Sequence, residues 1–222
     1  MKKFAVIVAG GSGQRMGAGI PKQFILLKGK PVLYYTIKTF LDTFDDLQVI
    51  LVLPAANMQT GQALIDEMQW NARVQLREGG ETRFHSVKNG LQLVTEPSIV
   101  FVHDGVRCMI TQDLIQRCYE TAMQHGSAIP AVAATDSIRI SNGASHHAID
   151  RTQVRIIQTP QTFQSNLILT AYNQPYREAF TDEATVVEAT GKQVFLVEGE
   201  YSNIKITRPV DLVIAEKMMG MV

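Results

Sequence analysis

A glycine-rich segment near the N-terminus holds the residues best suited to chemistry. Gly10, Gly11 and Gly13 follow a short apolar run, and Arg15 and Lys22 lie seven residues apart in the same segment. Glycines let backbone amides approach phosphate oxygens without obstruction by side chains. Two cations beside them would neutralise the charge that grows during transfer of a phosphorus group. The segment therefore predicts a triphosphate site, and the alternative is a surface loop with two solvated cations.

The two common nucleotide-binding fingerprints do not fit this segment. No register supplies the Gly-Lys-Ser/Thr ending of a Walker A loop. The dinucleotide fingerprint needs a third glycine where this chain has Met16, and an acidic residue where the second expected strand ends in Leu53 and Pro54. Both readings are excluded.

A carboxylate follows another apolar run. Asp104 lies just beyond residues 99–102, at the kind of strand end where ligands gather in open α/β sheets. Such a carboxylate can hold Mg²⁺ against nucleotide phosphates, since this ion takes one or two carboxylates plus phosphate oxygens and water. Arg107 would meet a substrate phosphate. The alternatives are a simple turn at Asp104 and a surface salt bridge at Arg107.

Three further segments are less specific on pattern alone. Residues 79–82 offer exposed backbone groups before a helix, with Thr82 as a candidate N-cap. Lys205 stands between isoleucines in an expected strand at residues 204–207, where alternation would point it to solvent. Residues 135–158 are polar with alternating β-branched residues and a turn at 141–143, which predicts a hairpin or arm.

The elements that must position these residues alternate along the chain. Apolar runs typical of buried parallel strands lie at residues 4–9, 49–53, 99–102 and 128–132. Segments of helical length lie at residues 31–41, 57–69, 82–94, 111–124, 164–174 and 209–219. The first of these opens with a proline suited to a first helical turn. The pattern predicts a single domain over residues 1–222, an α/β three-layer sandwich around a mostly parallel, Rossmann-like sheet with a protruding β-arm.

Composition narrows the class of protein. The 21 basic and 21 acidic residues give a formal net charge of zero, which argues against general nucleic-acid binding. No apolar stretch is long enough for a signal peptide or a membrane span, so no membrane partner is expected. Cys108 and Cys118 are too few for a disulfide framework or a zinc site. Free thiols suit a reducing compartment, and we expect a cytoplasmic protein.

Several segments together resemble one family of sugar-phosphate nucleotidyltransferases. They are the glycine-rich segment ending in Pro-Lys, residues 79–87, 103–107, 159–161, 182–184 and 203–207. In this order and over essentially the whole chain, they are similar to the 2-C-methyl-D-erythritol 4-phosphate cytidylyltransferases. The resemblance implies that CTP and a sugar-alcohol phosphate react to give a CDP-linked alcohol and pyrophosphate, with Mg²⁺ as cofactor, in non-mevalonate isoprenoid precursor synthesis.

The resemblance also implies roles for individual residues. The catalytic residues would be Arg15, Lys22, Arg151 and Lys205. The nucleotide would be bound by Ala9, Gly10, Gly11, Gly13, Gly80, Glu81, Arg83, Ser86, Asp104 and Gly105. The second substrate would be bound by Arg107, Ser137 and Thr159. Asp104 would hold the metal. Residues 135–158 would form a dimerisation arm of a homodimer with shared active sites, each taking Arg151 from the neighbouring subunit.

The chain departs from the family at two positions, and rivals remain open. Cys108 stands where proline is usual, and Ser137 where threonine is common. No second domain is expected, which excludes a bifunctional form. Ribitol-5-phosphate cytidylyltransferase is the nearest alternative, and a non-catalytic nucleotide-binding regulator is a rival of another class.

Overall fold

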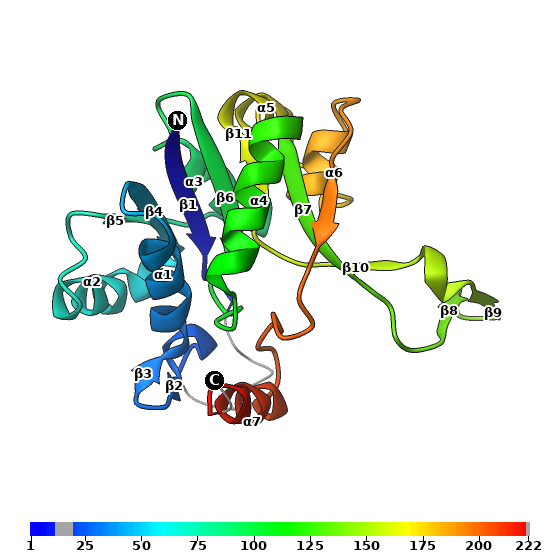
Figure 1. Cartoon of the computed structure of the whole chain (residues 1–222), viewed down its shortest axis with the longest axis horizontal. Coiled ribbons are helices and arrows are strands. Elements are labelled where there is room, and N and C mark those ends of the chain that lie inside the picture. The colour runs from blue at the N-terminus through cyan, green and yellow to red at the C-terminus, as the bar shows by residue number, and fades with distance from the viewer. Residues whose placement is uncertain (12–19, 221–222) are drawn as a thin grey trace.

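The structure, a computed structural model, describes residues 1–11 and 20–220 and is built on one mostly parallel sheet (Figure 1). Its strands lie in the order β10-β7-β11-β6-β1-β4-β5, and β12 also pairs with β7. Their bounds are β1 Lys2–Val8, β4 Leu47–Leu53, β5 Val74–Glu78, β6 Ser98–Asp104, β7 Ser127–Ala133, β10 Arg155–Ile157, β11 Gln161–Gln164 and β12 Leu196–Glu198. The four strands β6, β1, β4 and β5 are parallel neighbours, whereas β11 runs antiparallel to β6 and β7.

Helices cover both faces of the sheet. Their bounds are α1 Val32–Thr43, α2 Met58–Glu67, α3 Arg83–Leu91, α4 Gln112–His125, α5 Ser165–Ala171, α6 Glu183–Glu188 and α7 Pro209–Met218. On β1, Ala5 and Ile7 belong to the core under α1, α2 and α4, whereas Val6 and Val8 belong to the core under α3, α5 and α6. Successive strand residues point to opposite faces, so a strand buried on both sides reads as a continuous apolar run. The predicted three-layer sandwich is confirmed.

The predicted start is confirmed for one helix and shifted by one residue for another. The Thr82 hydroxyl accepts a hydrogen bond from the His85 amide at 3.3 Å, so Thr82 is the N-cap of α3, as predicted. Pro31 pairs in the short strand β3 (Lys30–Pro31) and precedes α1 rather than opening it. The extended backbone of Pro31 (ψ 146°) suits the residue before a helix better than its first turn.

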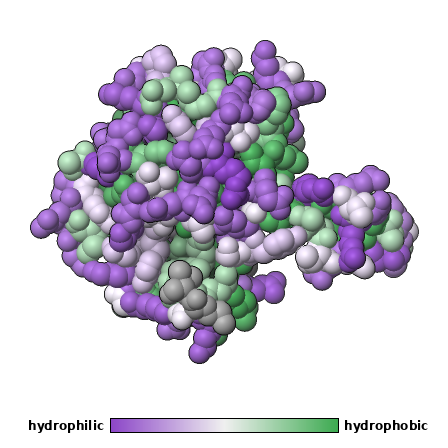
Figure 2. Space-filling view, in the orientation of Figure 1, coloured by the Kyte–Doolittle hydropathy of each residue, from purple (hydrophilic) through white to green (hydrophobic). Residues whose placement is uncertain are grey.

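The arm predicted over residues 135–158 ends before β10 and covers residues 135–154. The strands β8 (Ile138–Ser141) and β9 (His146–Ile149) form an antiparallel hairpin that stands clear of the body (Figures 1 and 2). The predicted bounds include the strand β10, but β10 pairs with β7 at the edge of the main sheet. Ile157 packs against the core under α3, α5 and α6, and an alternating β-branched pattern suits an edge strand as well as an arm.

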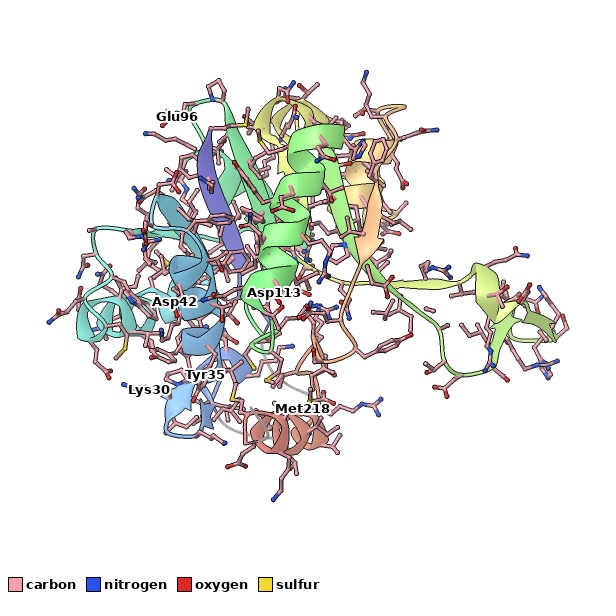
Figure 3. All side chains as sticks on the ribbon, viewed as in Figure 1. Lys30, Tyr35, Asp42, Glu96, Asp113 and Met218 are labelled. Carbon is pink, nitrogen blue, oxygen red and sulfur yellow. The ribbon has the colours of Figure 1, made fainter. Side chains whose placement is uncertain are left out.

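A third, small core joins the C-terminal helix to the body. Ala215 of α7 is buried with Leu27 of β2 (Leu26–Leu27) and Val32 of α1. The Tyr35 hydroxyl donates to the Leu27 carbonyl at 2.6 Å, and Figure 3 shows Tyr35 beside the β2–β3 hairpin. No helix in the described part of the chain is long and apolar enough to cross a membrane.

The strand predicted at residues 204–207 is absent, since this segment pairs with no strand. Ile206 lies in the small core, and its amide donates to the Val106 carbonyl at 3.0 Å. The alternation of apolar and polar residues therefore reflects one buried isoleucine, while the neighbouring Lys205 turns to Asp104. The segment is anchored to the loop after β6, which is what brings Lys205 to the sheet.

A buried polar chain fixes the carboxyl end of β6. The Thr159 hydroxyl accepts a hydrogen bond from the Asp104 amide at 3.1 Å and lies 3.0 Å from Nδ1 of His103. Nε2 of His103 faces the Arg107 carbonyl at 3.3 Å, and the Asn203 amide group donates to the Thr159 carbonyl at 2.9 Å. These partners assign the tautomer with hydrogen on Nε2. Burial lowers the pKa of His103 to about 3, so the ring is neutral at pH 7.

This neutral histidine predicts a pH-dependent stability. Between about pH 6.5 and 3 the unfolded chain binds a proton at His103 that the folded chain does not, so stability falls as the pH falls through this window. From pH 7 to 5.5 this one group should remove about 1 kcal/mol. Urea unfolding of His103→Gln, without nucleotide or metal, should show a correspondingly smaller loss over the same interval. An equal pH dependence in both proteins would contradict the assignment.

Candidate functional site

A cavity of about 510 Å³ opens at the carboxyl ends of β1, β4 and β6. This is the edge at which open parallel sheets bind ligands. Most of the predicted nucleotide-binding and catalytic residues within the described ranges line it. They are Ala9, Gly10, Gly11, Lys22, Gly80, Glu81, Arg83, Ser86, Asp104 and Lys205.

Asp104 is the negative centre of the site. Its Oδ2 lies 2.9 Å from Nζ of Lys205 and 3.5 Å from Nε of Arg107, and its Oδ1 lies 3.5 Å from Nε of Arg83. Burial would raise the pKa of Asp104, but the charges of Arg83, Lys205 and Arg107 hold it well below its ordinary range. The carboxylate is therefore ionised at every pH at which the protein would work.

Arg83 also pairs with a second carboxylate, that of Glu183, which is more deeply buried than Asp104. Both side-chain oxygens of Glu183 contact the Arg83 guanidinium, with NH2 3.0 Å from Oε2. Glu183 is fully buried, and its Oε1 also accepts from the Tyr172 hydroxyl at 3.1 Å. Burial alone would lower the pKa of Arg83, but Glu183 and Asp104 raise it. The sequence alone assigns no role to Glu183. The one feature that could have pointed to it is its place in residues 182–184, a segment shared with the family.

Lys22 lies between Gly11 and the segment that carries Lys205. Its Nζ donates to the Ile206 carbonyl at 3.2 Å, and a Cβ on Gly11 would lie 3.2 Å from its Cε. The next residue, Gln23, is buried, and its amide group donates to the Ala9 carbonyl at 2.8 Å. The 3-10 turn η2 (Lys22–Phe24) thus ties Lys22 to the end of β1.

The turn before α3 forms another part of the cavity wall. The Gly80 amide donates to the Ser86 hydroxyl at 3.1 Å, and that hydroxyl donates to the Thr82 carbonyl at 3.0 Å. A Cβ on Gly79 would lie 2.9 Å from Oγ of Ser86, so the backbone approaches this side chain closely. Gly79 and Gly80 both line the cavity, and since glycine has no side chain, they present backbone to it.

Three predicted ligands lie behind the cavity wall rather than on it. Gly105 packs where a Cβ would lie 2.9 Å from that of Ala9, so it is needed for close packing. Arg107 donates to the Asn203 carbonyl at 2.8 Å, and Thr159 supports the backbone of Asp104. Direct contacts of these residues with substrate stay predictions.

The remaining predicted residues lie elsewhere. Gly13 and Arg15 fall outside the described residues. Ser137 and Arg151 are exposed on the arm, and NH1 of Arg151 donates to the Thr135 carbonyl at 2.6 Å. Neither lines the cavity in the described part of the same chain.

The side chains at the cavity wall decide which kind of metal site is possible here. Over residues 1–11 and 20–220, no group of three or more His, Cys, Asp or Glu side chains is arranged to hold one. Asp104 and Glu81 are the carboxylates at the cavity wall. One ionised carboxylate fits Mg²⁺ when phosphate oxygens and water supply the other ligands. The site therefore fits a metal together with a nucleotide, and not a metal held by protein alone.

Comparison with known proteins points to one family. The sequence profile of the 2-C-methyl-D-erythritol 4-phosphate cytidylyltransferases matches residues 4–221. Proteins of that name from Bacteroides thetaiotaomicron and Phocaeicola vulgatus are 46% and 43% identical to this chain over 219 residues. Each match covers 99% of this chain and 100% of the relative.

Solved structures agree. The 4-diphosphocytidyl-2C-methyl-D-erythritol synthase of Anaerococcus prevotii is similar with a TM-score of 0.84 at 27% identity, covering 99% of this chain and 96% of that one. The 2-C-methyl-D-erythritol 4-phosphate cytidylyltransferase of Thermus thermophilus has a TM-score of 0.75 at 30% identity, covering 97% and 98%. The resemblance seen in the sequence is thus confirmed, and the chain belongs to the 2-C-methyl-D-erythritol 4-phosphate cytidylyltransferase family.

Proposed function

We propose that the cavity at the ends of β1, β4 and β6 binds CTP and that the residues around Asp104 transfer its cytidylyl group. The chain is a nucleotidyltransferase that joins CTP and 2-C-methyl-D-erythritol 4-phosphate. The observation that carries the site is a cavity with Lys22, Arg83 and Lys205 on its wall beside glycine backbone. Cations and exposed amides together suit a triphosphate and not a neutral substrate.

The reaction needs positioning and charge stabilisation. An oxygen of the acceptor phosphate attacks the α-phosphorus of CTP, and the bond from that phosphorus to the bridging oxygen of the β-phosphate breaks. Pyrophosphate leaves with the bonding electrons, and no covalent enzyme intermediate is required. Lys22, and Arg15 by family resemblance, would stabilise charge on the α-phosphate and the leaving group. Lys205 would orient the incoming phosphate from its seat on Asp104.

The cytosine ring is proposed to lie against the turn before α3. Gly80 and Ser86 line the cavity there, and a hydroxyl with two nearby backbone partners holds the turn in one shape. A shape fixed in this way can read a base through main-chain hydrogen bonds at little ordering cost.

Mg²⁺ is proposed as the cofactor, with Asp104 as its protein ligand. When bound, it would neutralise the nucleotide phosphates and polarise the α-phosphorus. Asp104 stays ionised because three cations surround it, so its carboxylate would be able to coordinate a metal bound together with the nucleotide phosphates.

We also propose a homodimer in which the arm of one subunit completes the site of the other. The β8–β9 hairpin projects away from the main sheet (Figure 1), Ser137 and Arg151 flank this hairpin in the sequence, and Ile140 in β8 is 51% exposed. A partner would cover such apolar surface and receive Arg151 as a ligand for the acceptor phosphate. The buried free thiols of Cys108 and Cys118 suit a cytoplasmic location.

The direct test of the function is pyrophosphate release with CTP, Mg²⁺ and a panel of sugar-alcohol phosphates. We expect turnover with 2-C-methyl-D-erythritol 4-phosphate and little with ribitol 5-phosphate. CTP binding without turnover on any acceptor would contradict the proposal.

The shared site predicts recovery of activity between two inactive variants. Lys22→Ala and Arg151→Ala should each be nearly inactive alone. When they are unfolded together and refolded as an equal mixture, half the dimers should be mixed, and each mixed dimer should hold one intact site. Roughly a quarter of wild-type activity should return under random two-fold pairing.

The control is Arg139→Ala, which removes another exposed arginine of the arm and should leave activity near that of the wild type. If Arg151 serves its own chain, every site in the mixture carries a lesion. No recovery, with mixed dimers confirmed by mass, would then rule out the shared site.

A further inference from the structure

Glu183 is a buried charge with no role in the function proposed above. It lies in the segment 182–184, is fully buried and lies behind the cavity rather than on its wall. A carboxylate is removed from water only at a large cost in free energy unless it is paired and hydrogen-bonded. Its partners therefore indicate what it is for.

Those partners connect Glu183 to Asp104 through one guanidinium. Arg83 contacts both oxygens of Glu183, with NH2 3.0 Å from Oε2, and lies 3.5 Å from Oδ1 of Asp104. The tighter, two-point contact is thus the one with Glu183. A bidentate pair fixes the plane of a guanidinium as well as its position.

Because Arg83 pairs mainly with Glu183, Asp104 remains accessible to Lys205. Its Nζ lies 2.9 Å from Oδ2 of Asp104, the shortest contact that Asp104 makes with a cation in the described structure. Without the charge on Glu183, the Arg83 guanidinium would be drawn fully onto Asp104. It would then compete with Lys205 and leave its own place on the cavity wall.

Glu183 itself is held rigidly. It occupies the first turn of α6, where Asp182 and Thr185 form a capping box. The Gln161 side chain donates to Asp182 at 2.9 Å and accepts from the Ala184 amide at 2.7 Å, which fixes the start of α6 to β11. A carboxylate at such a point can position another residue reproducibly.

A second set of contacts, through Tyr172 and Phe84, also connects Glu183 to the helix of Arg83. Tyr172, whose hydroxyl donates to Glu183 at 3.1 Å, stacks on Phe84 with ring centroids 4.7 Å apart. Phe84 follows Arg83 in α3. Its contact with Tyr172 therefore joins the helix that carries Arg83 to the tyrosine that binds Glu183.

We propose that Glu183 is a positioning residue that acts through Arg83, holding the guanidinium at the cavity wall so that Asp104 remains paired with Lys205. The proposal rests on the proposed function in one respect, since it takes this cavity to be the CTP site. It adds a residue with no contact to substrate to the determinants of transfer.

The test is a double-mutant cycle on kcat/KM for CTP. Glu183→Gln keeps the shape of the side chain and removes its charge, and it should lower kcat/KM about tenfold or more. Arg83→Gln should also lower it. In the Arg83→Gln background, Glu183→Gln should change kcat/KM by less than about twofold, because its effect passes through the arginine.

The matched control is Glu188→Gln, the same change at an exposed position of the same helix, which should leave kcat/KM unchanged. Urea unfolding followed by the fluorescence of Trp70 verifies that each variant is folded. If Glu183→Gln does not fold, Glu183→Asp gives a second cycle, since it keeps the charge but withdraws it from Arg83. It too should lower kcat/KM in the wild-type background and be silent in Arg83→Gln.

The outcomes separate the two proposals. Losses that multiply in the double variant, or a folded Glu183→Gln with wild-type kcat/KM, would overturn the positioning role. A wild-type protein that releases no pyrophosphate from CTP with any acceptor would instead overturn the proposed function.

Discussion

The buried carboxylate of Asp104 is the interaction on which the site depends. Arg83 and Lys205 come from distant parts of the sequence and Arg107 from the turn just after Asp104, and each contacts this one side chain. Cations so close together repel one another unless a negative charge lies between them. Asp104 is fixed in turn by the hydrogen bond from its amide to Thr159, and so by the polar chain through His103 and Asn203. The position of the cations therefore follows from the end of β6.

The local charge balance explains how a chain of zero net charge binds a polyanion. Arg83, Arg107 and Lys205 surround Asp104 and Glu183, which leaves one positive charge in excess within this cluster. An excess held in a partly enclosed space acts more strongly on a phosphate than the same charge spread over the surface. The paired charges stabilise one another, and the excess positive charge remains to attract phosphate.

The sequence predicted the layers well because the buried strands are continuous apolar runs and the helices between them are long. It missed β5, β11, β12 and α6, which are short or carry polar residues such as Gln161 and Glu183. It also predicted a strand at residues 204–207, because the alternation around Lys205 looks the same whether a strand or one buried isoleucine produces it. The contacts of Lys205 with Asp104 and of Arg83 with Glu183 join residues about 100 positions apart. No local pattern encodes such pairs, so only the family resemblance pointed to Lys205, and nothing assigned a role to Glu183.

Equilibrium unfolding of Asp104→Asn, alone and together with Lys205→Met, tests the central role of this carboxylate most directly. Asparagine keeps the shape of the side chain but leaves three cations without their common counter-charge, so we expect a loss of roughly 3 kcal/mol or more. Lys205→Met in the same chain removes one of those cations and should restore roughly 1 kcal/mol. A loss below about 0.5 kcal/mol for Asp104→Asn, or a double variant less stable than Asp104→Asn alone, would contradict the role of Asp104 as the charge that holds the site together.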